Sequence, residues 1–175
     1  QHLIAFLVML VVSLLTCHLV IISKKQLAIA RLRERRTSAM YALSRKLATS
    51  RGLKKILENS VQHIAEVFAS QVAMLLPNEQ GELTVKANSG TAFVLDEKEQ
   101  SVARWVHNLG QVAGLGTETL PFVSALYVPL LGRKEIVGVL RVLPADPTRL
   151  TSPEQLHLLE TFANQTALAV EADRA

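Results

Sequence analysis

The stretch ALYVPLLGRKEIVGVLRVL, residues 125–143, contains the pattern that decides the fold. Two apolar runs rich in Leu and Val, residues 125–131 and 136–143, flank the short polar segment Gly-Arg-Lys-Glu. Runs of this length and composition on either side of a turn signal predict two β-strands joined by a tight connection.

A second pair of predicted strands lies earlier in the chain. Residues 71–76 (QVAMLL) and 82–87 (ELTVKA) flank the turn signal Pro-Asn-Glu-Gln-Gly, and apolar side chains alternate along the second run. This spacing is typical of a β-hairpin. The sequence therefore predicts two consecutive pairs of strands.

Helices are predicted before and after the strand pairs. Residues 53–68 follow an interruption at Arg51-Gly52 and have the apolar spacing of an amphipathic helix. Its apolar positions are Leu53, Ile56, Leu57, Val61, Ile64, Ala65 and Phe68. Ser152 and Pro153 are expected to open the last helix as its N-cap and first-turn residue. The side chains of that helix expected to face inward are Leu156, Leu159, Phe162, Ala163 and Leu168.

The helix between the strand pairs has signals at both ends. Asp96 is a candidate N-cap, and Gly110 is expected to end the helix. The expected apolar face consists of Val102, Trp105, Val106 and Leu109. A glycine-rich loop, residues 113–117, follows the helix. The order helix, strand, strand, helix, strand, strand, helix predicts an α+β domain with an antiparallel sheet and packed helices.

Residues 3–23, LIAFLVMLVVSLLTCHLVIIS, contain no charged residue in 21 positions. As a helix this run is about 32 Å long, which is enough to cross a hydrocarbon core of about 30 Å. We interpret it as a transmembrane helix. A secretory signal peptide carries its charges before the apolar stretch, whereas here the charges follow it. The sequence begins at Gln1 rather than Met, so we expect it to be a piece of a longer protein.

A basic segment follows the apolar run. Between residues 24 and 55 there are eleven Lys or Arg residues and one acid, Glu34. Such an excess normally stays on the cytoplasmic side, so residues 24–175 are expected inside the cell. For the bases of residues 45–55 a solvated helix face is at least an equal alternative. The residues expected to contact anionic lipid headgroups are Lys24, Lys25, Arg31, Arg33, Arg35 and Arg36.

This segment is expected to be helical as well. Residues 24–50 contain neither Gly nor Pro, and apolar residues recur at spacings of three and four. The membrane helix is therefore expected to continue into the basic segment. The apolar positions are Ala39, Met40, Leu43 and Leu47.

Charge and composition exclude several classes of function. The formal net charge is +4, but residues 56–175 contain eight bases and fourteen acids. The high pI therefore does not indicate nucleic-acid binding. Cys17 is the single cysteine and lies in the apolar run, which excludes an intramolecular disulfide and a cytoplasmic thiol nucleophile. The five histidines lack metal-ligand spacing, so no metal site is expected.

The predicted order of elements resembles that of a GAF domain. Four stretches are similar, more specifically, to the membrane-proximal cytoplasmic region of the KdpD family of potassium-responsive sensor histidine kinases. These stretches are RERRTSAMYALSRKLA (33–48), WVHNLGQVAGLGTETLP (105–121), ALYVPL (125–130) and PEQLHLLETFANQTALAVE (153–171). The resemblance implies a transmembrane helix (1–23), a basic helical linker (24–52) and a GAF-like domain (53–175).

The resemblance also implies a function. In this family an ATP-dependent kinase core phosphorylates its own histidine and passes the phosphoryl group to a response regulator that controls potassium-uptake genes. The phosphoacceptor motif, the nucleotide-binding boxes of the kinase core and a GxxxxGK[ST] motif are absent from these 175 residues. We therefore expect a regulatory, signal-relay segment in the bacterial inner membrane, with no catalytic residue and no cofactor of its own. ATP would bind elsewhere in the parent protein, and a homodimer is a further hypothesis, because two helices in line suit parallel pairing.

GAF domains commonly bind small ligands beneath the middle helix and the loop after it. The resemblance implies such a pocket lined by Trp105, His107, Thr117, Thr119 and Tyr127. For Trp105 and Tyr127 the alternative is a core position with the polar group on a partner. The loop at residues 114–117 lacks the third glycine of a nucleotide motif and follows a helix, which favours a tight turn over an anion cradle.

A second class of function remains open. The chain could be a membrane-tethered GAF binding module that regulates another output, such as a cyclic-dinucleotide cyclase or a phosphodiesterase. Two GAF chemistries, methionine sulfoxide reduction and covalent bilin attachment, need a cysteine, and none follows Cys17. A histidine-containing helical hairpin downstream in the native chain would indicate the kinase.

Overall fold

The computed structural model describes residues 1–91, 93–150 and 152–174, without the side chains of residues 28, 32 and 149. The chain divides into two compact units, residues 1–39 and residues 40–175. Helix α1 (His2–Thr49) forms the first unit and continues into the second. Helix α2 (Leu53–Phe68) begins after a short link, so the predicted interruption at Arg51-Gly52 is confirmed.

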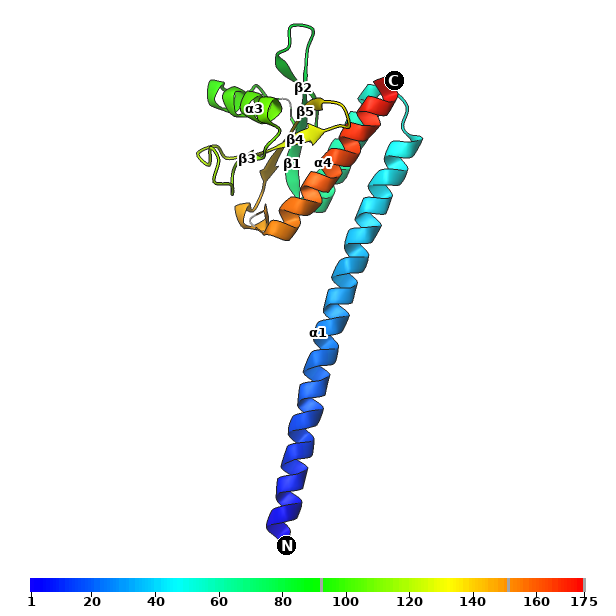
Figure 1. Cartoon of the computed structure of the whole chain (residues 1–175), viewed down its shortest axis with the longest axis vertical. Helices are drawn as coiled ribbons and strands as arrows, with labels where there is room; N and C mark the ends of the chain where they lie inside the picture. The colour runs from blue at the N-terminus through cyan, green and yellow to red at the C-terminus, as the bar shows by residue number, and fades with distance from the viewer. Residues whose placement is uncertain (92, 151, 175) are drawn as a thin grey trace. The chain divides into compact units, whose positions relative to one another are not determined.

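A five-stranded antiparallel sheet forms the centre of the second unit (Figure 1). Its strands are β1 (Ser70–Pro77), β2 (Leu83–Asn88), β3 (Ala113–Gly114), β4 (Leu126–Leu131) and β5 (Ile136–Pro144), in the order β2-β1-β5-β4-β3. The two predicted strand pairs, β1 with β2 and β4 with β5, are confirmed. Pairing of β1 with β5 joins the two hairpins into one sheet.

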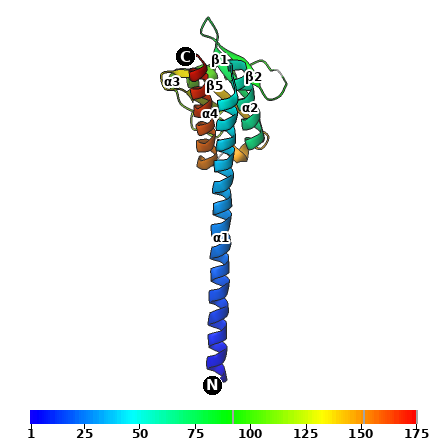
Figure 2. The ribbon, with the colours of Figure 1, turned by 90° about the vertical axis from the view of Figure 1, so that its right-hand side faces the viewer.

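The two faces of the sheet carry different helices. Helix α3 (Glu97–Leu109) packs on one face, where alternate strand residues such as Leu75, Tyr127 and Val139 join its apolar side chains in one cluster. Helices α2 and α4 (Pro153–Arg174) contact each other on the other face (Figure 2). A short 3-10 helix, η1 (Pro147–Leu150), precedes α4. These contacts confirm the predicted α+β architecture.

The helix caps read from the sequence are present. A side-chain oxygen of Asp96 accepts a hydrogen bond from the Glu99 N–H at 2.7 Å, and Gly110 ends α3 in the left-handed conformation with φ of 66°. The Ser152 hydroxyl accepts a hydrogen bond from the Gln155 N–H at 3.2 Å. Each cap satisfies a backbone group that a helix end would otherwise leave without a partner.

The structure differs from the sequence prediction at three places. Residues 113 and 114, expected in a loop, form the short strand β3. Leu109 is 56% exposed, because the apolar cluster beneath α3 reaches only to Val106. Leu168 is 43% exposed. Because each helical residue turns by about 100°, Leu168 lies about 200° around the helix from the buried Val170.

Candidate functional site

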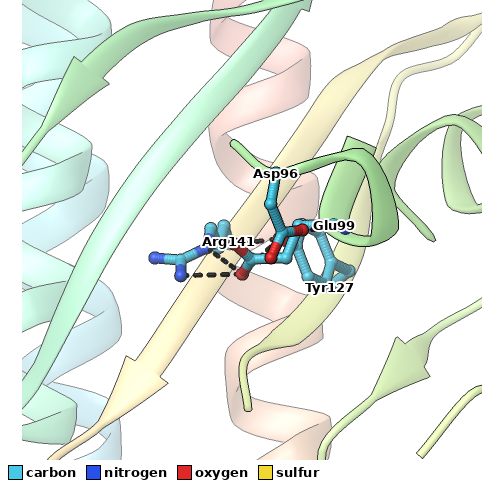
Figure 3. A network of polar contacts seen from close by, with 4 residues as sticks. All are labelled: Asp96, Glu99, Tyr127 and Arg141. Carbon is cyan, nitrogen blue, oxygen red and sulfur yellow. Dashed lines mark hydrogen bonds and ion pairs between the residues drawn. The ribbon is translucent and has the colours of Figure 1, made fainter. Parts of the chain in front are cut away.

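A polar network lies between α3 and the sheet (Figure 3). One carboxylate oxygen of Glu99, Oε1, accepts hydrogen bonds from the Tyr127 hydroxyl at 3.0 Å and from Arg141 Nε at 3.0 Å. Arg141 Nη2 donates to the same oxygen at 2.8 Å, which makes the contact an ion pair. Glu99 comes from the first turn of α3, whereas Tyr127 and Arg141 are paired neighbours on β4 and β5. The network therefore fastens α3 to the sheet.

The ion pair is largely shielded from solvent. The Arg141 side chain is 10% exposed and that of Glu99 is 17% exposed. The Phe93 ring covers the guanidinium, with 4.5 Å between Cζ of Arg141 and the ring centroid. A cation over an aromatic face at this distance is attracted to it. The guanidinium of Arg141 therefore lies between the carboxylate of Glu99 and the ring of Phe93.

Burial and neighbouring charges change the titration of this network. The pKa of the Tyr127 hydroxyl is raised, first by burial and then by the negative charge of Glu99. Burial by itself lowers the pKa of Arg141, but its hydrogen bonds to Glu99 and Tyr127 outweigh that effect and the pKa is raised. Tyr127 therefore stays a neutral donor and Arg141 stays charged at physiological pH.

The residues at the start of α3 fix the position of Glu99. Asp96 and Glu99 have the spacing of a capping box, in which the second side chain usually bonds back to the first residue's N–H. Here the Glu99 carboxylate reaches the guanidinium of Arg141, 42 residues later in the chain. The N-cap bond from Asp96 holds the first turn while the side chain of Glu99 is used for the tertiary contact.

The predicted pocket residues are found in three surroundings. Tyr127 is fully buried and Trp105 is half-buried in the same apolar cluster. The Thr117 hydroxyl lies 2.7 Å from the carbonyl oxygen of Gly114 and 2.8 Å from that of Thr119, so both threonines belong to one loop. These positions agree with the core-aromatic alternative, and the ligand pocket stays a prediction.

His107 has a different environment. Its Nδ1 is buried and makes no hydrogen bond to any part of the chain that the structure describes. Burial lowers the pKa of His107, and the charge of Glu135 partly opposes this. A lowered pKa favours the neutral imidazole.

The glycine-rich loop is a tight turn. Gly114 has φ of 100°, and a Cβ on it would collide with the Ala125 carbonyl oxygen. The N–H groups of Gly114, Leu115 and Thr117 donate to carbonyls of Thr119, Ala125 and Gly114. Because these amides already donate to backbone carbonyls, the arrangement favours the turn over an anion cradle.

Sequence reasoning missed Glu99, Arg141 and Phe93. One signal was available, since Arg141 is the single charged residue in the apolar run 136–143. A charge within a buried strand requires a partner. Its partner could not be named, because Glu99 lies on an element far along the chain.

Most of the basic segment lies in α1, and its last residues lie in the link and in α2. In the part of the chain with described side chains, the apolar residues of 3–23 are exposed, and α1 is the one helix long and apolar enough to cross a membrane. Arg36 is half-buried and has interactions of its own. The other predicted headgroup contacts, Lys24, Lys25, Arg31, Arg33 and Arg35, are exposed.

Comparison with known proteins agrees with this architecture. The model of the GAF domain family matches residues 52–172. The chain is 36% identical to the sensor protein KdpD of Escherichia coli (strain K12) over 171 residues, which is 98% of this chain and 19% of that protein. It is 24% identical to the sensor protein KdpD of Clostridium acetobutylicum over 180 residues, covering 99% of this chain and 20% of that protein. The chain thus spans about a fifth of the length of these relatives.

A solved structure is similar to most of the chain. The crystal structure of the native GAF domain of the potassium sensor histidine kinase KdpD from Escherichia coli has a TM-score of 0.69 and 33% identity, and the match covers 79% of this chain and 94% of that one. The resemblance read from the sequence is therefore confirmed. The chain belongs to the GAF domain family and is, along nearly its whole length, a homologue of the KdpD sensor proteins.

Proposed function

We propose that this chain is the regulatory, signal-relay segment of a membrane-bound two-component sensor histidine kinase that controls potassium-uptake genes. The homology to KdpD sensor proteins over 98% of the chain supports this function. The similar crystal structure is the GAF domain of a protein described as a potassium sensor histidine kinase. In this proposal the chain itself carries no catalytic residue.

The proposal places residues 3–23 across the bacterial inner membrane and residues 24–175 in the cytoplasm. The apolar, exposed beginning of α1 and the basic residues after it support this placement. Each Lys or Arg near an anionic membrane surface contributes about 1 kcal/mol of attraction. Lys24, Lys25 and the arginines at positions 31, 33, 35 and 36 are the proposed headgroup contacts.

The parent protein would supply the chemistry. Its kinase core would bind ATP and phosphorylate a histidine outside these residues, and a response regulator would receive the phosphoryl group. We propose that two copies of the chain associate, since relay along a helix leaving a membrane suits a parallel pair. The GAF domain would set the resting balance between the signalling states.

One observation carries the relay mechanism. Helical secondary structure is unbroken from His2 to Thr49, and the last part of this helix has Leu43 and Leu47 buried within the second unit. A piston, tilt or rotation of the apolar segment would therefore pass along α1 to the GAF domain.

Insertion of two glycines after Ala39 in the intact parent protein tests this mechanism. The insertion is expected to uncouple the stimulus from autophosphorylation, because glycine lowers helix stability by about 1 kcal/mol per residue and the insertion rotates the helix by about 200°. A matched insertion in the exposed turn at residues 79–81 is expected to leave the response intact. An unchanged response after the insertion at Ala39 would count against the relay.

The alternative is a membrane-tethered GAF binding module that regulates a cyclic-dinucleotide cyclase or a phosphodiesterase. This alternative needs a ligand, and Trp105, His107, Thr117, Thr119 and Tyr127 are the proposed pocket. Sequencing the native gene beyond residue 175 separates the two functions. A phosphoacceptor histidine on a helical hairpin favours the kinase, and an acid-rich catalytic loop favours the cyclase.

A further inference from the structure

The last turn of α4 contains two carboxylates that bind backbone N–H groups of other elements. Glu171 binds the turn between β4 and β5, and Asp173 binds the link between α1 and α2. Both partners are distant in sequence, 38 and 121 residues away respectively. The end of α4 therefore joins two separate parts of the second unit.

Glu171 binds the β4–β5 turn with both oxygens. Oε2 accepts from the Arg133 N–H at 2.8 Å, and Oε1 accepts from the Lys134 N–H at 3.2 Å and the Glu135 N–H at 3.4 Å. A Cβ at Gly132 would collide with this carboxylate, so glycine permits the close approach. The N–H of Arg133, with smaller contributions from Lys134 and Glu135, lowers the pKa of Glu171.

Asp173 binds the α1–α2 link. Its Oδ1 accepts a hydrogen bond from the Gly52 N–H at 3.1 Å. Gly52 is the N-cap of α2, with φ of 89° and no side chain to cap the helix. From α2, Asn59 Nδ2 donates to the Ser50 hydroxyl at 2.6 Å. The link is therefore held from α4 as well as from α2.

We infer that the last turn of α4 is a clasp that reports the position of the α1–α2 link. Glu171 holds the last turn of α4 against the β4–β5 turn, while the single Asp173–Gly52 bond opens when the end of α1 moves. In this structure the bond is formed. This inference rests on the proposed relay for its role, and it names the contact through which α1 acts on α4.

Hydrogen exchange of the full 175-residue chain in lipid nanodiscs tests the contact itself. Asp173→Ala is expected to speed exchange of the Gly52 amide about fivefold, since one hydrogen bond contributes about 1 kcal/mol. Asp173→Asn, which keeps an acceptor, is expected to restore part of the protection. The amides of Arg133 and Glu135 are expected to exchange at the wild-type rate in both variants. Unchanged exchange at Gly52 in Asp173→Ala would overturn the clasp.

The regulatory role of the Asp173–Gly52 contact is tested by autophosphorylation of the intact parent protein at low and high potassium chloride. Asp173→Ala is expected to change the ratio between the two conditions by up to about fivefold, since the lost hydrogen bond contributes about 1 kcal/mol. Glu118→Gln removes one charge in an exposed loop and is expected to leave the ratio unchanged. An unchanged ratio in Asp173→Ala would overturn the regulatory inference. Absence of autophosphorylation in the wild-type parent would instead contradict the proposed function. The hydrogen-exchange result would still support the Asp173–Gly52 contact.

Discussion

The two faces of the sheet are packed in different ways. Beneath α2 and α4 the core is mainly apolar, and Phe162 makes edge contacts with Phe68 and His63 at ring centroid distances of 5.8 and 5.7 Å. Beneath α3 the sheet presents Arg141, which forms an ion pair with Glu99 of α3. Because side chains alternate along a strand, one strand serves both faces with different residues.

The difference shows that two kinds of interaction hold the helices on the two faces. Apolar packing is insensitive to small electrostatic changes, so the α2–α4 face depends mainly on its buried side-chain contacts. An ion pair away from water costs several kcal/mol when one partner is removed, because the other charge is left unpaired. The α3 face therefore responds sharply to any event that separates Glu99 from Arg141.

The largest expected loss of stability comes from a substitution in the apolar core beneath α2 and α4. Phe162→Ala removes a completely buried ring between α2 and α4 and is expected to destabilise the chain by about 3–5 kcal/mol. Urea unfolding in detergent micelles, followed by fluorescence of the single tryptophan, Trp105, measures this change. Phe122 is 64% exposed, and Phe122→Ala is expected to change stability by less than about 0.5 kcal/mol. Equal losses in the two variants would contradict the view that buried side-chain contacts stabilise this face.

The next largest loss of stability is expected from a substitution in the ion pair beneath α3. Glu99→Ala leaves Arg141 without its carboxylate and is expected to cost about 2 kcal/mol, a value reduced for the partial exposure of the pair. The same unfolding experiment measures the loss. Glu97 is exposed in the same first turn of α3, and Glu97→Ala is the matched control with an expected change of less than about 0.5 kcal/mol.

A second substitution sharpens this result. Arg141→Met in the Glu99→Ala background is expected to recover part of the lost stability, because it removes the unpaired buried charge and keeps an apolar side chain of similar length. If the double variant is less stable than Glu99→Ala, packing by the arginine rather than its charge dominates the α3 face.

The smallest expected effect lies outside both faces, at Glu171, and depends on pH. The pKa of Glu171 is lowered from its ordinary value of 4.5 by the backbone N–H groups it binds. A lowered pKa gives a stabilisation that is complete above about pH 4.5 and disappears as pH falls through the lowered value. Glu171→Gln is therefore expected to lower Tm at pH 7.

Thermal unfolding of wild type and Glu171→Gln between pH 7 and pH 2 measures the difference in Tm between them. The difference in Tm between wild type and Glu171→Gln is expected to shrink steadily below about pH 4.5, where the wild-type carboxyl becomes protonated. Glu118→Gln serves again as the control with equal charge change. A gap that stays constant over the whole range would show that the ionised carboxylate is not responsible.

Local features of the sequence predicted most of the fold. The two hairpins, the helix breaks and the caps at Asp96, Gly110 and Ser152 depend on residues within a few positions of one another, so pattern and turn chemistry identified them. Strand β3 was missed because two residues have no periodicity and pair only when β4 is already in place. The exposure of Leu109 was missed because it depends on where the neighbouring cluster ends.

The candidate site was predicted less completely. Tyr127 was named, and the alternative of a core aromatic with a polar partner describes its position. Arg141 was visible as a charge in an apolar strand, but its partner was not. Glu99 also fits a capping box, and nothing in the local sequence distinguishes that role from an ion pair with β5.

The sequence by itself determined the kind of elements, their order, the apolar N-terminal run with its basic flank, and the family, because these follow from short-range periodicity, charge and shared motifs. Only the tertiary structure decided that Glu99 meets Arg141 and that Asp173 meets Gly52, 42 and 121 residues away. Such contacts depend on how the chain closes long loops, and no local preference specifies which distant groups a folded sheet brings together.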